Sequence, residues 1–216
     1  MHTRALLIAL ALVACKKEPP AEPAAAAKPK TEAPKATGAA ALVAADVWIC
    51  DGGAGKSWIN KGTTKAEIEA LVGAENLKDE EENFMESEET FVVTTLFPDD
   101  KDRRATIHWM NDDASQGVSR LDLYGKKWRT SDGLYAGASL AEVEKINGGP
   151  FELMGFEWDM AGMATTKSAG IDFVVPKANR TRPEYEKVVG DGEFKSTDPN
   201  MRAVEPIVGV VKCQPI

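Results

Sequence analysis

GTTKAEIEALVG (residues 62–73) and GASLAEVEKING (residues 137–148) decide the fold, because they repeat one pattern, with five of twelve positions identical. In each copy a hydroxyl residue, Thr64 or Ser139, stands three positions before a glutamate. This is the capping-box pattern that begins a helix. A glycine closes each copy, where a helix C-terminus favours a left-handed residue. The sequence therefore predicts two short helices in equivalent positions.

The correspondence continues upstream of both helices. Gly55-Lys56-Ser57-Trp58 precedes the first, and Gly125-Lys126-Lys127-Trp128 precedes the second. Two matches in the same order indicate a duplicated unit. The alternative is that good helix starts resemble one another because they share the same capping chemistry.

Runs with strand character follow each predicted helix. Ile107 and Trp109 alternate with Thr106 and His108, which is typical of an antiparallel sheet with one solvated face. The predicted strands are residues 91–97, 105–110, 118–124, 151–159, 171–175 and 204–213, with a bend at Gly155. Residues 177–203 are polar and are predicted to form a loop. The expected fold is α+β, with two tandem repeats of a short helix plus an antiparallel sheet, residues 42–128 and 129–216.

The amino terminus has the order of an export signal: a basic start, a short apolar run and small residues. The run has about ten residues, whereas a spanning helix needs about 20. Its end, Leu12-Val13-Ala14-Cys15, resembles the lipobox of bacterial lipoproteins. The resemblance implies that residues 1–14 are a signal peptide and that Cys15 is lipidated. The alternative is a buried Ala/Leu helix with an incidental cysteine.

Residues 15–41 are rich in Pro, Ala and Lys and are expected to be a disordered spacer behind the lipid anchor. The spacer is net +2, which anionic headgroups favour, and residues 42–216 are net −11. Acidity disfavours nucleic acid as a partner. Lys16 stands where an Asp tends to retain lipoproteins of Gram-negative families at the inner membrane. The resemblance thus implies a lipid-anchored envelope protein, at the outer membrane if the cell is Gram-negative.

Cys50 and Cys213 remain once Cys15 is assigned to lipid. An even pair in an exported protein favours a disulfide, here between the first and the last predicted strands. Two separate buried thiols are the alternative. His108 is the one histidine after processing, and the acidic turns match no calcium-loop spacing, so we expect neither a metal site nor a cofactor.

The repeated Gly-x-Thr/Ser-x-x-Glu-Ile/Val pattern ending in Gly is similar to the SmpA/OmlA family of outer-membrane lipoproteins, which assist assembly of β-barrel proteins. The tandem arrangement resembles the β-lactamase-inhibitor-protein-like fold, whose sheets form a concave binding face. The stretch from Trp128 to Asp159 also resembles a motif of uncharacterised bacterial secreted proteins. These motifs consist mostly of capping and turn residues, so they imply the fold more than the function.

These features lead us to expect a non-catalytic protein-binding or assembly module with an unidentified protein partner. Trp109, Trp128 and Trp158 are the candidate binding surface if they face outward, or core residues if they do not. The rival hypothesis is a hydrolase that uses Asp112, Asp113 or the segment Glu157–Asp159 in a cleft. A small-ligand or metal scavenger is a weaker alternative. The sequence does not indicate the oligomeric state.

Overall fold

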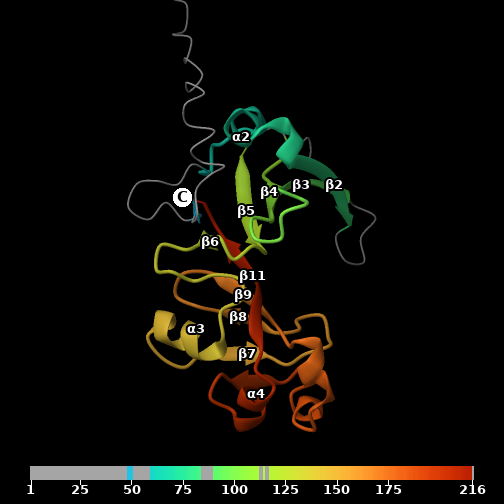
Figure 1. Cartoon of the computed structure of the whole chain (residues 1–216), viewed down its shortest axis with the longest axis vertical. Helices are drawn as coiled ribbons and strands as arrows, with labels where there is room; N and C mark the ends of the chain where they lie inside the picture. Colours follow the sequence, from blue (N-terminus) through green and yellow to red (C-terminus); the bar gives the residue numbers. More distant parts are fainter. Residues whose placement is uncertain (1–47, 51–58, 84–89, 112–113, 115–116, 216) are drawn as a thin grey trace, which may run out of the picture. The chain divides into compact units, whose positions relative to one another are not determined.

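The structure is a computed structural model that describes residues 48–50, 59–83, 90–111, 114 and 117–215. The lipobox, the spacer and Asp112 and Asp113 lie outside these described residues. Within them the fold is α+β, as predicted, and combines three short helices with a nine-stranded antiparallel sheet (Figure 1).

The two predicted helices are α2 (Lys65–Val72) and α3 (Leu140–Asn147). Each begins with a complete capping box, formed by Thr64 with Glu67 and by Ser139 with Glu142. The closing glycines differ, since Gly148 is left-handed whereas Gly73 combines a φ of 87° with an extended ψ of 141°. Local hydrogen bonding therefore places both helix starts where the repeated pattern predicts them.

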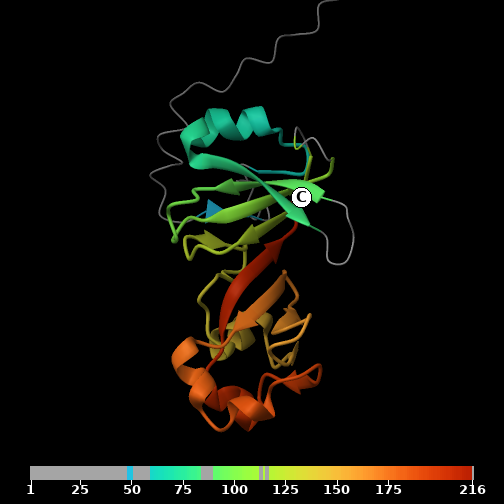
Figure 2. The ribbon, with the colours of Figure 1, turned by 90° about the vertical axis from the view of Figure 1, so that its right-hand side faces the viewer.

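The sheet has the strand order β10-β7-β8-β9-β11-β5-β4-β3-β2. Its strands are β2 (Leu77–Asn83), β3 (Thr90–Leu96), β4 (Ala105–Trp109), β5 (Val118–Leu123), β7 (Glu152–Met154), β8 (Met163–Thr165), β9 (Gly170–Val174), β10 (Glu193–Lys195) and β11 (Ile207–Cys213). The last strand, β11, lies between β5 and β9 and joins the strands of the first half to those of the second (Figure 2). One sheet therefore runs through the expected boundary at residue 128.

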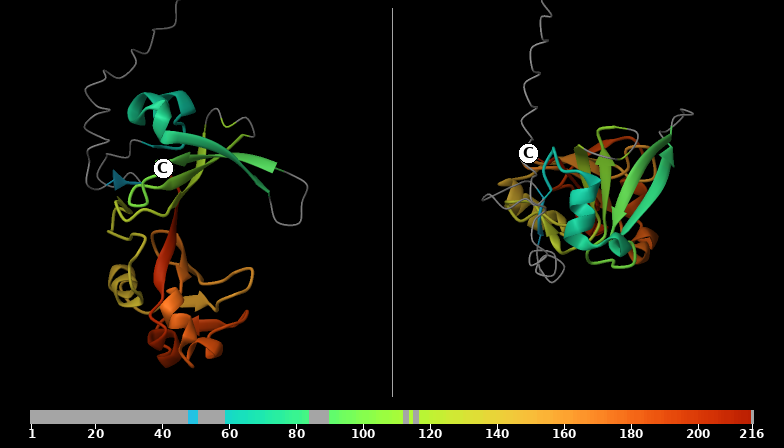
Figure 3. Two further views of the ribbon diagram at one scale, coloured as in Figure 1. Left: turned by 45° about the vertical axis from the view of Figure 1, so that its right-hand side comes forward. Right: turned by 90° about the horizontal axis from the view of Figure 1, so that it is seen from above.

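Helices α2 and α3 pack on one face of the sheet (Figure 3). Lys65 of α2 pairs with Asp79 of β2, and Asp79 accepts a hydrogen bond from Thr94, the register partner of Ile107. The face that α2 covers is therefore that of Ile107 and of the other core side chains of β4 and β5. On the α3 side, Val143 is buried in the same apolar cluster.

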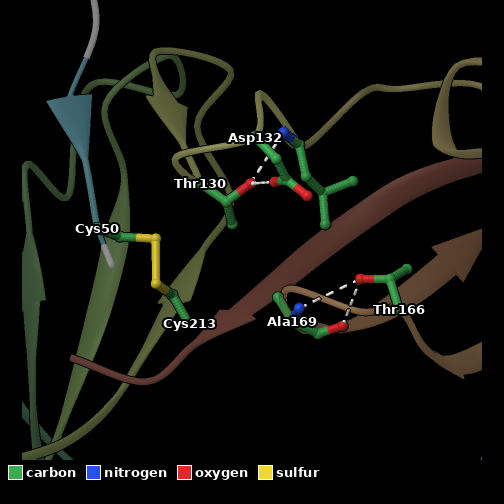
Figure 4. Close-up of a disulfide and its surroundings, with 7 residues drawn as sticks. Cys50, Thr130, Asp132, Thr166, Ala169 and Cys213 are labelled. Carbon is green, nitrogen blue, oxygen red and sulfur yellow. Dashed lines mark hydrogen bonds between the residues drawn. A yellow bond between two sulfur atoms is a disulfide. The ribbon is translucent and has the colours of Figure 1, made fainter. Parts of the chain in front are cut away.

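The predicted disulfide between Cys50 and Cys213 is present (Figure 4). Cys50 directly follows the short strand β1 (Trp48–Ile49), which pairs in parallel with β6 (Trp128–Arg129). Cys213 ends β11 and is buried, as Cys50 is. The bridge thus ties β1 to the central strand of the sheet across 163 residues of chain.

Three segments differ from the sequence-based expectation. The acidic run at residues 78–82 was not predicted to be a strand but belongs to β2. Residues 177–203 were predicted to be a loop. They contain two 3-10 helices, η3 (Lys177–Thr181) and η4 (Tyr185–Lys187), followed by β10 and the helix α4 (Pro199–Ala203). The predicted strand over residues 151–159 stops at Met154. A Cβ atom on Gly155 would lie 2.4 Å from the carbonyl oxygen of Gly190, so the chain bends there at a close backbone contact. The bend at Gly155 was predicted.

Candidate binding face

The sheet face opposite α2 and α3 is the candidate functional site, and we call it the open face. Strand register assigns its side chains, because residues opposite each other in a ladder point to the same face. It comprises Lys78, Glu80, Glu82, Phe91, Val93, Thr95, Thr106, His108, Arg120, Asp122, Glu152, Met154, Met163, Thr165, Asp172, Val174, Glu193, Lys195, Ile207, Val210 and Lys212. Charged and polar side chains cross its centre beside the apolar groups of β9 and β11, and exposed apolar side chains also lie toward both ends.

A charged cluster occupies the centre of the open face. His108 Nε2 lies 2.9 Å from Asp122 Oδ2, and Arg120 Nε donates to Asp122 Oδ1 at 2.7 Å. Burial alone would raise the pKa of Asp122, but its hydrogen bonds with His108 and Arg120 hold that pKa below its ordinary value. Asp122 is therefore a buried, ionised carboxylate with two partners.

The cluster continues across β11 into the second half of the sheet. Lys212 is the register partner of Asp122, and its Nζ donates to Asp172 Oδ1 on β9 at 2.8 Å. Opposite charges thus alternate over three neighbouring strands, β5, β11 and β9, and His108 extends the row onto β4. We call this row, made of His108, Arg120, Asp122, Lys212 and Asp172, the polar ladder.

A hollow of about 270 Å³ opens beside the polar ladder at the ends of β2 to β5. Phe91, His108, Arg120 and Ser119 are among the residues that line it, together with Glu82. Phe91 is 39% exposed, so the hollow offers an apolar wall next to charged groups. This combination suits an apolar side chain that arrives with polar neighbours.

A second hollow, of about 450 Å³, lies over β7, β8 and β10 at the other end of the open face. Met154, Met160 and Met163 contribute three thioethers to its lining, and Glu152 and Glu193 contribute carboxylates. Methionine is unbranched and polarisable, so it adapts to partners of different shape. The two hollows therefore place accessible apolar groups on either side of the polar ladder.

The three tryptophans of the predicted surface do not lie together on a face. Trp128 is buried, and its Nε1 donates to the carbonyl oxygen of Arg103 at 2.8 Å. Trp109 is also buried, and its Nε1 donates to Thr94 Oγ1 at 3.0 Å on the helix side of the sheet. Trp158 is 59% exposed in the turn between β7 and β8. Trp109 and Trp128 are therefore core residues, and of the three only Trp158 lies on the surface.

Of the candidate catalytic carboxylates, Glu157 and Asp159 lie in the described residues, both in the turn after β7. Glu157 accepts a hydrogen bond from the Tyr185 hydroxyl at 2.7 Å, and burial together with this bond raises the pKa of Tyr185 to about 12. Asp159 is exposed. Glu157 thus anchors the turn after β7 to the η4 segment.

Sequence reasoning did not select Asp122, Arg120 or His108 as site residues. One signal was visible, since Arg120 and Asp122 are two residues apart on a predicted strand and must share a face. Their partner His108 is set by the pairing of β4 with β5, which places His108 opposite Arg120. Sequence alone does not give that register.

Comparison with solved structures shows a distant structural likeness. No protein-family model matches the chain, and no curated protein matches it. The crystal structure of the uncharacterized protein yfeY from Escherichia coli is similar, with a TM-score of 0.42 and 9% sequence identity. The match covers 72% of this chain and 90% of that one. Its function is uncharacterised. A similarity this distant carries no argument about the site.

Among the residues that the structure describes, no helix is long and apolar enough to cross a bilayer.

Proposed function

We propose that this chain is an envelope lipoprotein that binds another protein through the open face of its sheet, without catalysis. The observation that carries the proposal is the pattern of that face, a polar ladder with accessible apolar groups on both sides. Protein interfaces are enriched in aromatic, methionine and arginine side chains, and this face exposes all three kinds. The partner that fits presents an apolar side chain to the hollow at Phe91 and hydrogen-bonding groups to the ladder.

The charges of the face favour binding over hydrolysis. On the open face, hydrogen bonds hold the pKa values of Glu80 and Asp122 below their ordinary values, and at Asp122 they outweigh the effect of burial. A carboxylic general acid working near neutral pH needs the opposite shift. Ionised, partnered carboxylates are suited to electrostatic complementarity with a partner.

A duplication of the helix-and-sheet unit would account for the width of the open face. The capping boxes of α2 and α3 have the same geometry and each is followed by antiparallel strands. We propose that the halves derive from one duplicated unit, as in the β-lactamase-inhibitor-protein-like fold. A duplicated sheet offers a wider binding surface than either half alone.

The anchor is the second part of the proposal. Cys15 would carry the lipid, and the basic spacer would hold the folded part off the membrane. Labelling of cells with radioactive palmitate tests this directly. We expect label on the wild-type chain and none on Cys15→Ala; equal labelling of the two would contradict the anchor.

Site-specific photo-cross-linking tests the binding face. The photoreactive amino acid p-benzoylphenylalanine replaces Phe91 in one variant and Thr165 in another, so that both halves of the open face are sampled. The matched control places it at Lys145, which is exposed on α3. We expect discrete adducts in intact cells from the open-face positions and none from Lys145. Adducts from Lys145 alone, or none from any position, would count against the proposal.

A further inference from the structure

Three methionines are brought together at the turn between β7 and β8. Leu153 pairs with Ala164, and Gly162 N donates to the carbonyl oxygen of Gly155 at 2.9 Å. Between these two contacts, Met154 lies directly opposite Met163. Directly opposed residues in an antiparallel pair have Cβ atoms about 5 Å apart and share a face.

Met160 joins this pair through the turn itself. Met163 N donates to the carbonyl oxygen of Met160 at 3.0 Å, which closes a four-residue turn. Gly162 supplies the positive φ of 69° that the turn requires. All three side chains line the same hollow, and Met160 and Met163 are 48% and 38% exposed. The three methionines therefore lie around one hollow that solutes can reach.

Carboxylates lie on both sides of the methionine pair. Glu193 of β10 is the register partner of Met154, and Asp172 of β9 is the register partner of Met163. Glu152 also lines the hollow. A row of carboxylate, thioether, thioether and carboxylate thus crosses four strands. Because Asp172 is already paired with Lys212, the negative charge at the hollow comes from Glu152 and Glu193, which both line it.

We propose that Met154, Met160 and Met163 form a binding site for a soft monovalent cation, Cu(I). Thioether sulfur selects soft ions such as Cu(I), whereas zinc prefers thiolate and imidazole, and calcium prefers oxygen. Ag(I) has the same charge and comparable softness, so it is the redox-stable substitute for experiments. The flanking carboxylates favour a positive charge without needing to coordinate it.

The site can be separated from a simple apolar docking patch by substitution with leucine. Leucine keeps the volume and apolar character of methionine but lacks the sulfur. Met163→Leu therefore removes one ligand and leaves the shape of the surface. Met110→Leu is the matched control, because Met110 is also exposed and lies at the end of β4, far along the sheet from β8.

The experiment measures Cu(I) affinity of the full chain in detergent by anaerobic competition with bicinchoninate. We expect Met163→Leu and Met154→Leu each to weaken binding by about tenfold or more, a loss that even outer-shell changes can cause at metal sites. Met110→Leu should match wild type. Each variant retains Cys15, so any contribution from that cysteine is common to all.

Thermal unfolding with Ag(I) provides the second readout. Ag(I) should raise the unfolding midpoint of wild type and Met110→Leu, and should leave Met154→Leu/Met163→Leu unchanged. Equal Cu(I) affinity in Met163→Leu and Met110→Leu would overturn the site. If cross-linking from Phe91 persists in the leucine variants while Cu(I) binding is lost, the cation site stands apart from protein docking.

Discussion

His108 Nε2 lies within hydrogen-bonding distance of Asp122 Oδ2, and the same nitrogen faces Arg120 Nη2 at 3.0 Å. A guanidinium can only donate, and an ionised carboxylate can only accept. When His108 Nε2 carries a proton, it donates to Asp122 and cannot accept from Arg120. When it carries none, it accepts from Arg120 and makes no hydrogen bond to Asp122. Asp122 has Arg120 as a second partner, so the carboxylate stays bound in either state of the ring.

Asp122 should contribute stability that depends on pH. Its pKa is lower in the folded chain than its ordinary value, so the contribution is fully present above about pH 4 and is lost as the pH falls through the folded pKa. We expect Asp122→Asn to lose about 1–3 kcal/mol at pH 7 and progressively less as the pH falls below about 4. Urea unfolding at several pH values measures this. Asp159→Asn, at an exposed position, is the control; a parallel pH profile for both variants would contradict the role of Asp122.

The disulfide should be a large contributor to stability. It closes a loop of 163 residues, for which the loss of chain entropy in the unfolded state gives an upper value of about 5 kcal/mol. We expect Cys50→Ser/Cys213→Ser to lower the free energy of unfolding by about 2–5 kcal/mol. Circular dichroism during thermal unfolding checks this, with the reduced wild type as the comparison. An unchanged unfolding midpoint in the double variant and in the reduced wild type would show that the bridge is dispensable.

Gly155 should be intolerant of a side chain. A Cβ atom there would lie 2.4 Å from the carbonyl oxygen of Gly190 and 2.8 Å from that of Val188. We expect Gly155→Ala to destabilise the fold by about 2–3 kcal/mol, because backbone atoms must move. Gly149→Ala is the control, since nothing lies within 4 Å of its Cβ position. The prediction fails if the two variants unfold at the same urea concentration.

Truncation to alanine should lower the free energy of unfolding strongly at Trp128 and hardly at all at Trp158. Trp128 packs edge-on against Trp48 with ring centroids 4.6 Å apart, so Trp128→Ala should cost about 3–5 kcal/mol. Trp158→Ala should change stability by less than about 0.5 kcal/mol, because the side chain is largely in solvent. Chemical denaturation followed by far-ultraviolet circular dichroism compares them. A large loss in Trp158→Ala would mean that its ring supports the turn.

Local chemistry explains which elements could be predicted from sequence. The helices at α2 and α3 follow from capping residues three positions apart, and β4 and β5 follow from alternation of apolar and polar residues. Strand β2 was missed because four consecutive acidic residues argue against a strand. Its carboxylates are satisfied by distant partners, with Glu80 accepting from Thr95 at 2.8 Å and Asp79 accepting from Thr94. Such contacts exist only after the strands have paired.

The candidate sites were hidden for the same reason. Met160 and Met163 are close in sequence, but Met154 joins them only through the register of β7 and β8. Likewise, His108 reaches Asp122 only because β4 and β5 are neighbours. The tryptophans were open to either interpretation, since a strand pattern assigns residues to two faces without saying which face is covered.

The position of β11 has a consequence for the order of synthesis. Strands β5 and β9 are both made before it, yet each needs it as a neighbour. Until residues 207–213 leave the ribosome, the nascent chain carries two partial sheets with unpaired edges, which can pair with other chains instead. A ribosome that stalls or terminates shortly before Ile207 would therefore release an aggregation-prone product, although nearly all of the sheet has been translated.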